Sequence, residues 1–201
     1  MDERTEVEKD VLREIGNIGG GNALTSLSMM LDRSLYLDLP SCQLVKREEA
    51  GKLLKNPDSL YAGVSMTMTG TIECVLVLLM NKQFTKLVID SLDPDEPELN
   101  IQSLTEMQES ALCEVGNIMG NSYITALGDM LELQIDVSVP RIVVGAGNSV
   151  LQEFLGGHAV QLERLLFINS AFRTKDQTLE SCMLLCPTNE SLSAMLEKLS
   201  F

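Results

Sequence analysis

Two long windows of the chain, residues 5–31 and 104–131, carry apolar residues at the three- and four-residue steps of a helix. The apolar positions are Val11, Leu12, Ile15 and Ile18 in the first window and Leu112, Val115, Ile118 and Met119 in the second. This spacing predicts that each half of the chain opens with a long helix.

Both helical windows are followed by an alternating pattern. Apolar residues alternate with mainly polar ones over residues 35–39 and 135–139, and the two runs stop at Pro40 and Pro140. Alternation of this kind places every second side chain on one face of a strand, and proline removes the donor that would continue the ladder. We therefore predict a half-buried strand in each half.

The remaining elements are also predicted in pairs. A β-hairpin over residues 59–69 and 71–80 turns at Gly70, and residues 161–172 and 178–186 form its counterpart. A short helix is predicted over 47–55. Closing helices are predicted over 82–91 and 188–200, and Asn81 and either Thr188 or Asn189 are suitable N-caps for them.

The sequence matches itself at an offset of 100 residues up to Pro40, and at an offset of 107 later, where residues 71–79 resemble 178–186. This indicates a two-fold internal duplication. The residues that recur are Leu12, Glu14, Gly16, Asn17, Ile18, Gly20, Thr25, Leu27, Met30, Leu31 and Pro40, which match Leu112, Glu114, Gly116, Asn117, Ile118, Gly120, Thr125, Leu127, Met130, Leu131 and Pro140.

Two prolines and four acidic residues lie between the halves, within residues 92–100, and predict a solvated connector. We predict a single domain over residues 1–201, made of two pseudo-symmetric halves (1–92 and 104–201) and a connector (93–103). The fold class is α/β, with strands of both halves in one antiparallel-rich sheet and the two long helices packed on a face. The pattern leaves the strand order open.

The candidate site is a motif that occurs twice, with a glutamate, an asparagine three residues later and a proline after a further 22 residues. In the two halves these residues are Glu14, Asn17 and Pro40, and Glu114, Asn117 and Pro140. A spacing of three residues places the acid and the amide about 60° apart on one helix face, one turn from each other.

Glycine and asparagine are unusually frequent beside the first motif, at Gly16, Asn17 and residues 19–22. Each glycine costs about 1 kcal/mol relative to alanine within a helix. The glycines are explained if the helix makes a close contact or breaks there, with Asn17 as a local backbone partner. Close packing does not explain why a glutamate and an asparagine recur at the same spacing.

These residues resemble the phosphatase family of CheC, CheX and FliY, whose motif is Glu-x-x-Asn, 22 residues and Pro, and the stretch 14–23 is similar to the CheC signature. Two motifs and the length of the chain favour the two-site CheC type with its CheC-like fold. The resemblance implies a substrate, the phosphoaspartate of a CheY-like chemotaxis response regulator. It also implies roles: Asn17 and Asn117 orient the attacking water, and Glu14 and Glu114 pair with the regulator's active-site lysine.

The resemblance further implies that the chain binds CheD, a receptor-modifying deamidase, through the second half downstream of Pro140. The candidate segment is residues 145–155, where four apolar residues form a stripe at helical spacing. They are Val150, Leu151, Phe154 and Leu155. The alternative is that this stripe packs in the core, as amphipathic helices ordinarily do.

Composition excludes several other classes. A net charge of -14 argues against binding of nucleic acid or of acidic membrane surfaces. No signal peptide or membrane-spanning run is evident, so we expect a cytoplasmic protein. The five cysteines are typical of buried thiols in a reducing compartment, and His158, the single histidine, lies outside both motifs. We expect no intrinsic cofactor or metal, and expect any Mg²⁺ to be carried by the response regulator.

Two other functions remain open. The chain could be a non-catalytic adaptor that binds CheD or a response regulator, with the Glu and Asn pairs serving recognition only. It could also be a structural component associated with the flagellar switch, similar to a truncated FliY. Within the enzyme hypothesis, Gly21 matches Asn121 and Asn22 matches Ser122, a difference that favours two unequal sites.

Overall fold

The computed structural model describes residues 3–38, 41–92, 99–156 and 163–199. The first half contains α1 (Glu3–Met30), β1 (Tyr36–Leu37), β2 (Ser41–Lys46), the 3₁₀ helix η1 (Arg47–Leu53), β3 (Leu60–Gly70), β4 (Cys74–Asn81) and α2 (Lys82–Leu92). The second half contains α3 (Glu106–Leu131), β5 (Ile135–Val137), β6 (Arg141–Ala146), α4 (Gly147–Leu155), β7 (Arg164–Arg173), β8 (Thr178–Pro187) and α5 (Asn189–Leu199). The second half thus repeats the element order of the first, with α4 in place of η1.

One antiparallel sheet of eight strands holds both halves together. Its order is β1-β7-β8-β4-β3-β5, with β2 also paired to β7 and β6 also paired to β3. The edge strands of the first half therefore extend the hairpin of the second half, and those of the second half extend the hairpin of the first. Neither half has a complete sheet of its own.

The centre of the sheet is the pairing of β4 with β8. Val77 lies opposite Leu184 in this ladder, and the sequence offset of 107 residues also equates these two residues. The two halves therefore meet at positions that the sequence repeat equates. Successive side chains of a strand point to opposite faces, so the nearly continuous apolar run of β4 supplies two cores at once.

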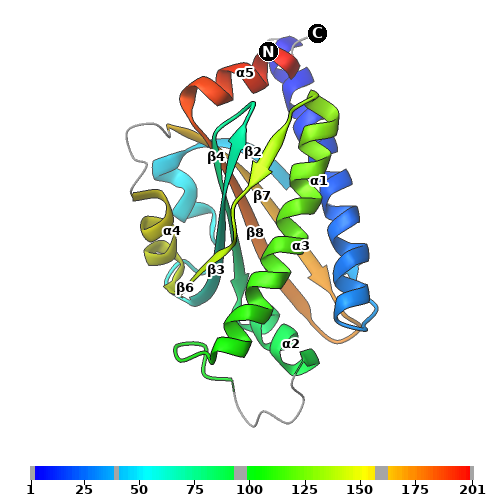
Figure 1. Cartoon of the computed structure of the whole chain (residues 1–201), viewed down its shortest axis with the longest axis vertical. Helices are drawn as coiled ribbons and strands as arrows, with labels where there is room; N and C mark the ends of the chain where they lie inside the picture. The colour runs from blue at the N-terminus through cyan, green and yellow to red at the C-terminus, as the bar shows by residue number, and fades with distance from the viewer. Residues whose placement is uncertain (1–2, 39–40, 93–98, 157–162, 200–201) are drawn as a thin grey trace.

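The two faces of the sheet carry different layers. On one face, α1 and α3 lie side by side and run in opposite directions (Figure 1), and the larger hydrophobic core lies beneath them and α2. On the other face, α4 and η1 cover a smaller core that includes Val77, Phe154 and Phe167. The result is a helix, sheet and helix layering that places the long helices on the outside.

Most predicted elements are confirmed, including both long helices, both hairpins and the closing helices. The Asn81 side chain accepts from the backbone N–H of Phe84, and the Thr188 hydroxyl accepts from that of Ser191, so both act as N-caps. Gly70 ends β3 with a φ of 116°, a left-handed conformation that favours glycine.

Three predictions differ from the structure. Of the strand predicted over 35–39, Tyr36–Leu37 form β1, and residue 39 and Pro40 lie outside the described residues. The strands β2 and β6 were not predicted, because they are half-buried edge strands whose partners lie in the other half of the chain. Residues 93–98, which hold the prolines and acidic residues of the predicted solvated connector, lie outside the described residues. At the end of the connector, Leu99 and Ile101 are buried, since their apolar side chains join the protein interior.

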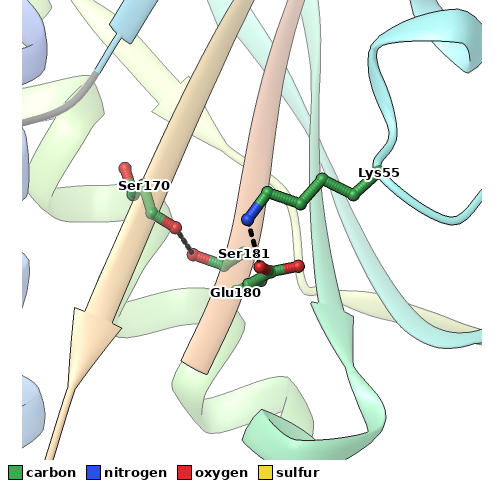
Figure 2. A network of polar contacts seen from close by, with 4 residues as sticks. All are labelled: Lys55, Ser170, Glu180 and Ser181. Atoms are coloured by element: carbon green, nitrogen blue, oxygen red, sulfur yellow. Dashed lines mark hydrogen bonds and ion pairs between the residues drawn. The ribbon is translucent and has the colours of Figure 1, made fainter. Parts of the chain in front are cut away.

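Tyr123 connects α3 to the sheet. Its hydroxyl lies 3.0 Å from the Ser170 Oγ on β7, and the Ser181 hydroxyl on β8 donates to the backbone carbonyl of Ser170. Figure 2 shows Ser170 and Ser181 beside the ion pair of Lys55 with Glu180, which lies on the opposite face of β8. Burial raises the pKa of Tyr123 to about 12, because the phenolate would lose its hydration.

This shift predicts a loss of stability in alkali. The folded state favours neutral Tyr123, whose phenol ordinarily titrates near pH 10. The contribution to stability is therefore complete below pH 10 and is lost as the pH rises from 10 through 12, by on the order of 2 kcal/mol. Urea unfolding between pH 8 and 12 measures it. The Tyr123→Phe variant should show a shallower decline over this range, and an equal decline in both proteins would contradict the assignment.

Candidate functional site

Both Glu and Asn pairs lie on the outer side of the long helices. On α1, Glu14 is exposed and Asn17 is half-buried, and on α3, Glu114 is exposed and Asn117 is half-buried. The residues between them point inward, since Ile15 and Val115 are fully buried. Each pair therefore presents a carboxylate and a carboxamide that a docking protein can reach.

The two Glu and Asn pairs are separated along the helices. The helices run antiparallel (Figure 1), and Gly19 of α1 contacts Tyr123 of α3. Asn17 lies two residues before Gly19 on α1, and Asn117 lies six residues before Tyr123 on α3. Because the helices are antiparallel, the two asparagines lie on opposite sides of this contact. At a rise of 1.5 Å per residue, the two amides are about 12 Å apart along the helix axis. Pro140 of the second motif is half-buried immediately before β6.

Close packing accounts for glycines of both motif helices. A Cβ added at Gly116 would lie 2.4 Å from Val64 Cγ1, and one at Gly120 would lie 2.1 Å from Met66 Cε, so α3 lies directly on β3 at these positions. A Cβ at Gly19 would lie 2.9 Å from Tyr123 Cα. These three glycines therefore pack inward, and the Glu and Asn pairs stay on the outer side of the helices.

The two asparagines differ in their surroundings. The Asn121 amide donates to the Asn117 Oδ1 at 2.8 Å, one helical turn along α3. The equivalent position on α1 is Gly21, and the Asn17 carboxamide makes no hydrogen bond to any residue that the structure describes. The sequence difference at these positions thus corresponds to a difference in hydrogen bonding.

The cysteines are poor candidates for a nucleophile. All five thiols are free. Burial raises the pKa of Cys42 to about 11 and that of Cys74 to about 12, and it also raises the pKa values of Cys182 and Cys186. The reactive thiolate is therefore disfavoured at neutral pH.

No grouping of three metal-ligating His, Cys, Asp or Glu side chains occurs within residues 3–38, 41–92, 99–156 and 163–199. His158 lies outside the residues described. None of the helices in the described parts of the chain is long and apolar enough to cross a membrane.

The apolar stripe of α4 lies in the core. The structure buries Val150, Leu151, Phe154 and Leu155 to 5% exposure or less, against the face of the sheet opposite the long helices. The expectation of an exposed partner-docking stripe therefore needs correction, since a helix of this length packs its one apolar face on the sheet. A partner can contact only the outer residues of α4, which include Asn148, Gln152 and Glu153.

A sequence model of the CheC-like family matches residues 7–37 and 107–144, the segments that contain both Glu and Asn pairs. The chain is 29% identical to the CheY-P phosphatase CheC of Bacillus subtilis, over 94% of this chain and 92% of that protein. It is 26% identical to the flagellar motor switch phosphatase FliY of the same organism, over 71% of this chain and only 37% of FliY. The crystal structure of Thermotoga maritima FliY shares the fold, with a TM-score of 0.70 at 22% identity, over 96% of this chain and 95% of that one.

Proposed function

We propose that the chain is a member of the CheC-like family and a phosphatase that hydrolyses the phosphoaspartate of a CheY-like chemotaxis response regulator. The observation that carries the proposal is the placement of the two Glu and Asn pairs. Both are accessible on the outer side of α1 and α3, while the intervening residues pack inward. The likeness to the CheY-P phosphatase CheC of Bacillus subtilis supports the same activity.

Hydrolysis of a phosphoaspartate requires few catalytic groups from the phosphatase. An acyl phosphate already hydrolyses slowly, so acceleration comes mainly from placing a water in line with the phosphorus and holding it there. The carboxamide oxygen of Asn17 or Asn117 accepts a hydrogen bond from this water and fixes its direction. The amide has no proton to gain or lose in this role, which leaves the proton of the water to the phosphoryl group.

The glutamates serve alignment in this proposal. Glu14 and Glu114 are exposed one turn before their asparagines, where each can form a charge-assisted contact with the lysine beside the regulator's phosphoaspartate. The Mg²⁺ that neutralises the phosphoryl oxygens is carried by the regulator. The two sites are about 12 Å apart along the helix axis, and the face of the regulator that carries the phosphoaspartate would dock at either of them.

CheD is the second proposed partner. Because the apolar stripe of α4 is buried, CheD would contact the outer side of α4 and η1. A surface pocket of about 270 Å³ lies between these two elements and is lined by Arg47, Glu48, Asn148 and Gln152 among others. A partner docked there would leave both Glu and Asn pairs free, since they lie on the opposite layer of the fold.

Turnover distinguishes the enzyme from an adaptor. The experiment is phosphate release from a phosphorylated CheY-like regulator, with the chain present at one twentieth of the regulator concentration, with and without CheD. A phosphatase releases many equivalents of phosphate per chain. An adaptor binds the regulator but changes the release by no more than the amount it binds, and this result would favour the alternative of a non-catalytic protein or a FliY-like switch component.

A further inference from the structure

The second site contains a side chain that the first site lacks. Asn121 lies one turn after Asn117, and its amide donates to the Asn117 Oδ1 at 2.8 Å, in a half-buried position on the outer side of α3. From this contact, and resting on the proposed function, we propose that Asn121 is a positioning residue. It holds the Asn117 carboxamide in the orientation that meets the attacking water.

The physical reason is the freedom of the amide. The terminal torsion of asparagine is broad, so an unpartnered carboxamide samples many orientations. A hydrogen bond from Asn121 restricts this torsion before any partner arrives, as side-chain pairs four residues apart do on a helix surface. The carbonyl oxygen keeps its second lone pair, so Asn117 can accept from water while it is held.

Neighbouring hydroxyls do not provide the same support. The Ser122 hydroxyl donates to the Ile118 carbonyl, and the Thr25 hydroxyl on α1 donates to the Gly21 carbonyl, so both are bonded to the backbone. A short hydroxyl side chain on these helices thus reaches the carbonyl one turn earlier. Among the described residues, Asn121 is the one whose side chain hydrogen-bonds to that of Asn117.

The first site offers the matching test, because it has room for the missing residue. Position 21 is glycine, and a Cβ added there meets no atom within 4 Å. Asn17 has no hydrogen-bond partner among the described residues. The Gly21→Asn substitution would therefore place an amide at the same distance along α1 that separates Asn121 from Asn117.

The experiment uses two single-site proteins, each of which keeps one intact Glu and Asn pair. In the Asn17→Ala protein, where only the second site remains, Asn121→Ala should lower kcat by about 3- to 10-fold with little change in KM, the effect of freeing one ordered side chain. Asn121→Gln, which keeps an amide donor, should recover part of this loss. In the Asn117→Ala protein, Gly21→Asn should raise kcat by a similar factor, whereas Gly21→Ala should not.

The outcomes separate this inference from the function on which it rests. An unchanged kcat for Asn121→Ala, or equal effects of alanine and glutamine at position 121, would overturn the role of Asn121 alone. A rise in KM without a fall in kcat would also overturn it, because a recognition contact behaves in that way. If neither single-site protein releases phosphate faster than the Asn17→Ala, Asn117→Ala protein, the proposed function is overturned as well.

Discussion

The Asn17→Ala, Asn117→Ala double variant is expected to lose the acceleration of phosphoaspartate hydrolysis by about 100-fold or more, the usual cost of removing a group that acts directly on the reacting atoms. The fold should survive, because both side chains are only half-buried and alanine is the better helix former. Regulator binding should also survive, since Glu14 and Glu114 remain. Phosphate release and binding are measured on the same preparation.

Asn22→Ala is the matched control for this variant. Asn22 is an exposed asparagine of the same helix, outside the Glu and Asn pair. Its removal should leave phosphate release close to that of the unaltered chain. Activity that persists in the double variant at the level of this control would contradict water positioning by the two asparagines, whatever the affinity for the regulator.

The Gly19→Ala variant is expected to lose stability. The new Cβ would lie 2.9 Å from Tyr123 Cα, and a backbone atom cannot move aside as the end of a side chain can. Overpacking of this kind costs roughly 1–3 kcal/mol, which exceeds the gain of about 1 kcal/mol in helix propensity. Urea unfolding gives the difference in the free energy of unfolding.

The Gly21→Ala variant, on the same helix, is expected to change the stability in the opposite direction. A Cβ at Gly21 meets no atom within 4 Å, so the substitution keeps only the propensity term and should stabilise the protein by about 0.5–1 kcal/mol. Both variants add one methyl group to α1, at positions two residues apart. A Gly19→Ala protein as stable as the Gly21→Ala protein would show that α1 and α3 are not in close contact at this point.

The sequence is sufficient to predict the elements whose signals are local. The long helices, the hairpins, the cap at Asn81 and a cap at either Thr188 or Asn189 follow from periodicity and from single capping side chains. The strands β2 and β6 do not, because their hydrogen bonds go to β7 and β3 in the opposite half of the chain. The strand order is a property of the same long-range pairings.

Prediction of the candidate site from the sequence has the same limit. The repeated spacing of Glu14 with Asn17 and of Glu114 with Asn117 predicts a shared outer helix face, and the structure places both pairs there. Which glycines pack closely depends on Tyr123 and Val64, residues far away in the sequence. The stripe of α4 has the spacing of a docking surface, and only its contact with the sheet shows that it belongs to the core.

The most direct test of the account is a structure of the chain bound to a CheY-like regulator that carries Mg²⁺ and beryllofluoride in place of the phosphoryl group. The account predicts the Oδ1 of Asn17 or Asn117 at hydrogen-bond distance, about 2.6–3.2 Å, from a water in line with the aspartate–beryllium bond, with the neighbouring glutamate on the regulator's lysine. A complex in which the regulator docks elsewhere, with both carboxamides facing bulk solvent, would contradict it.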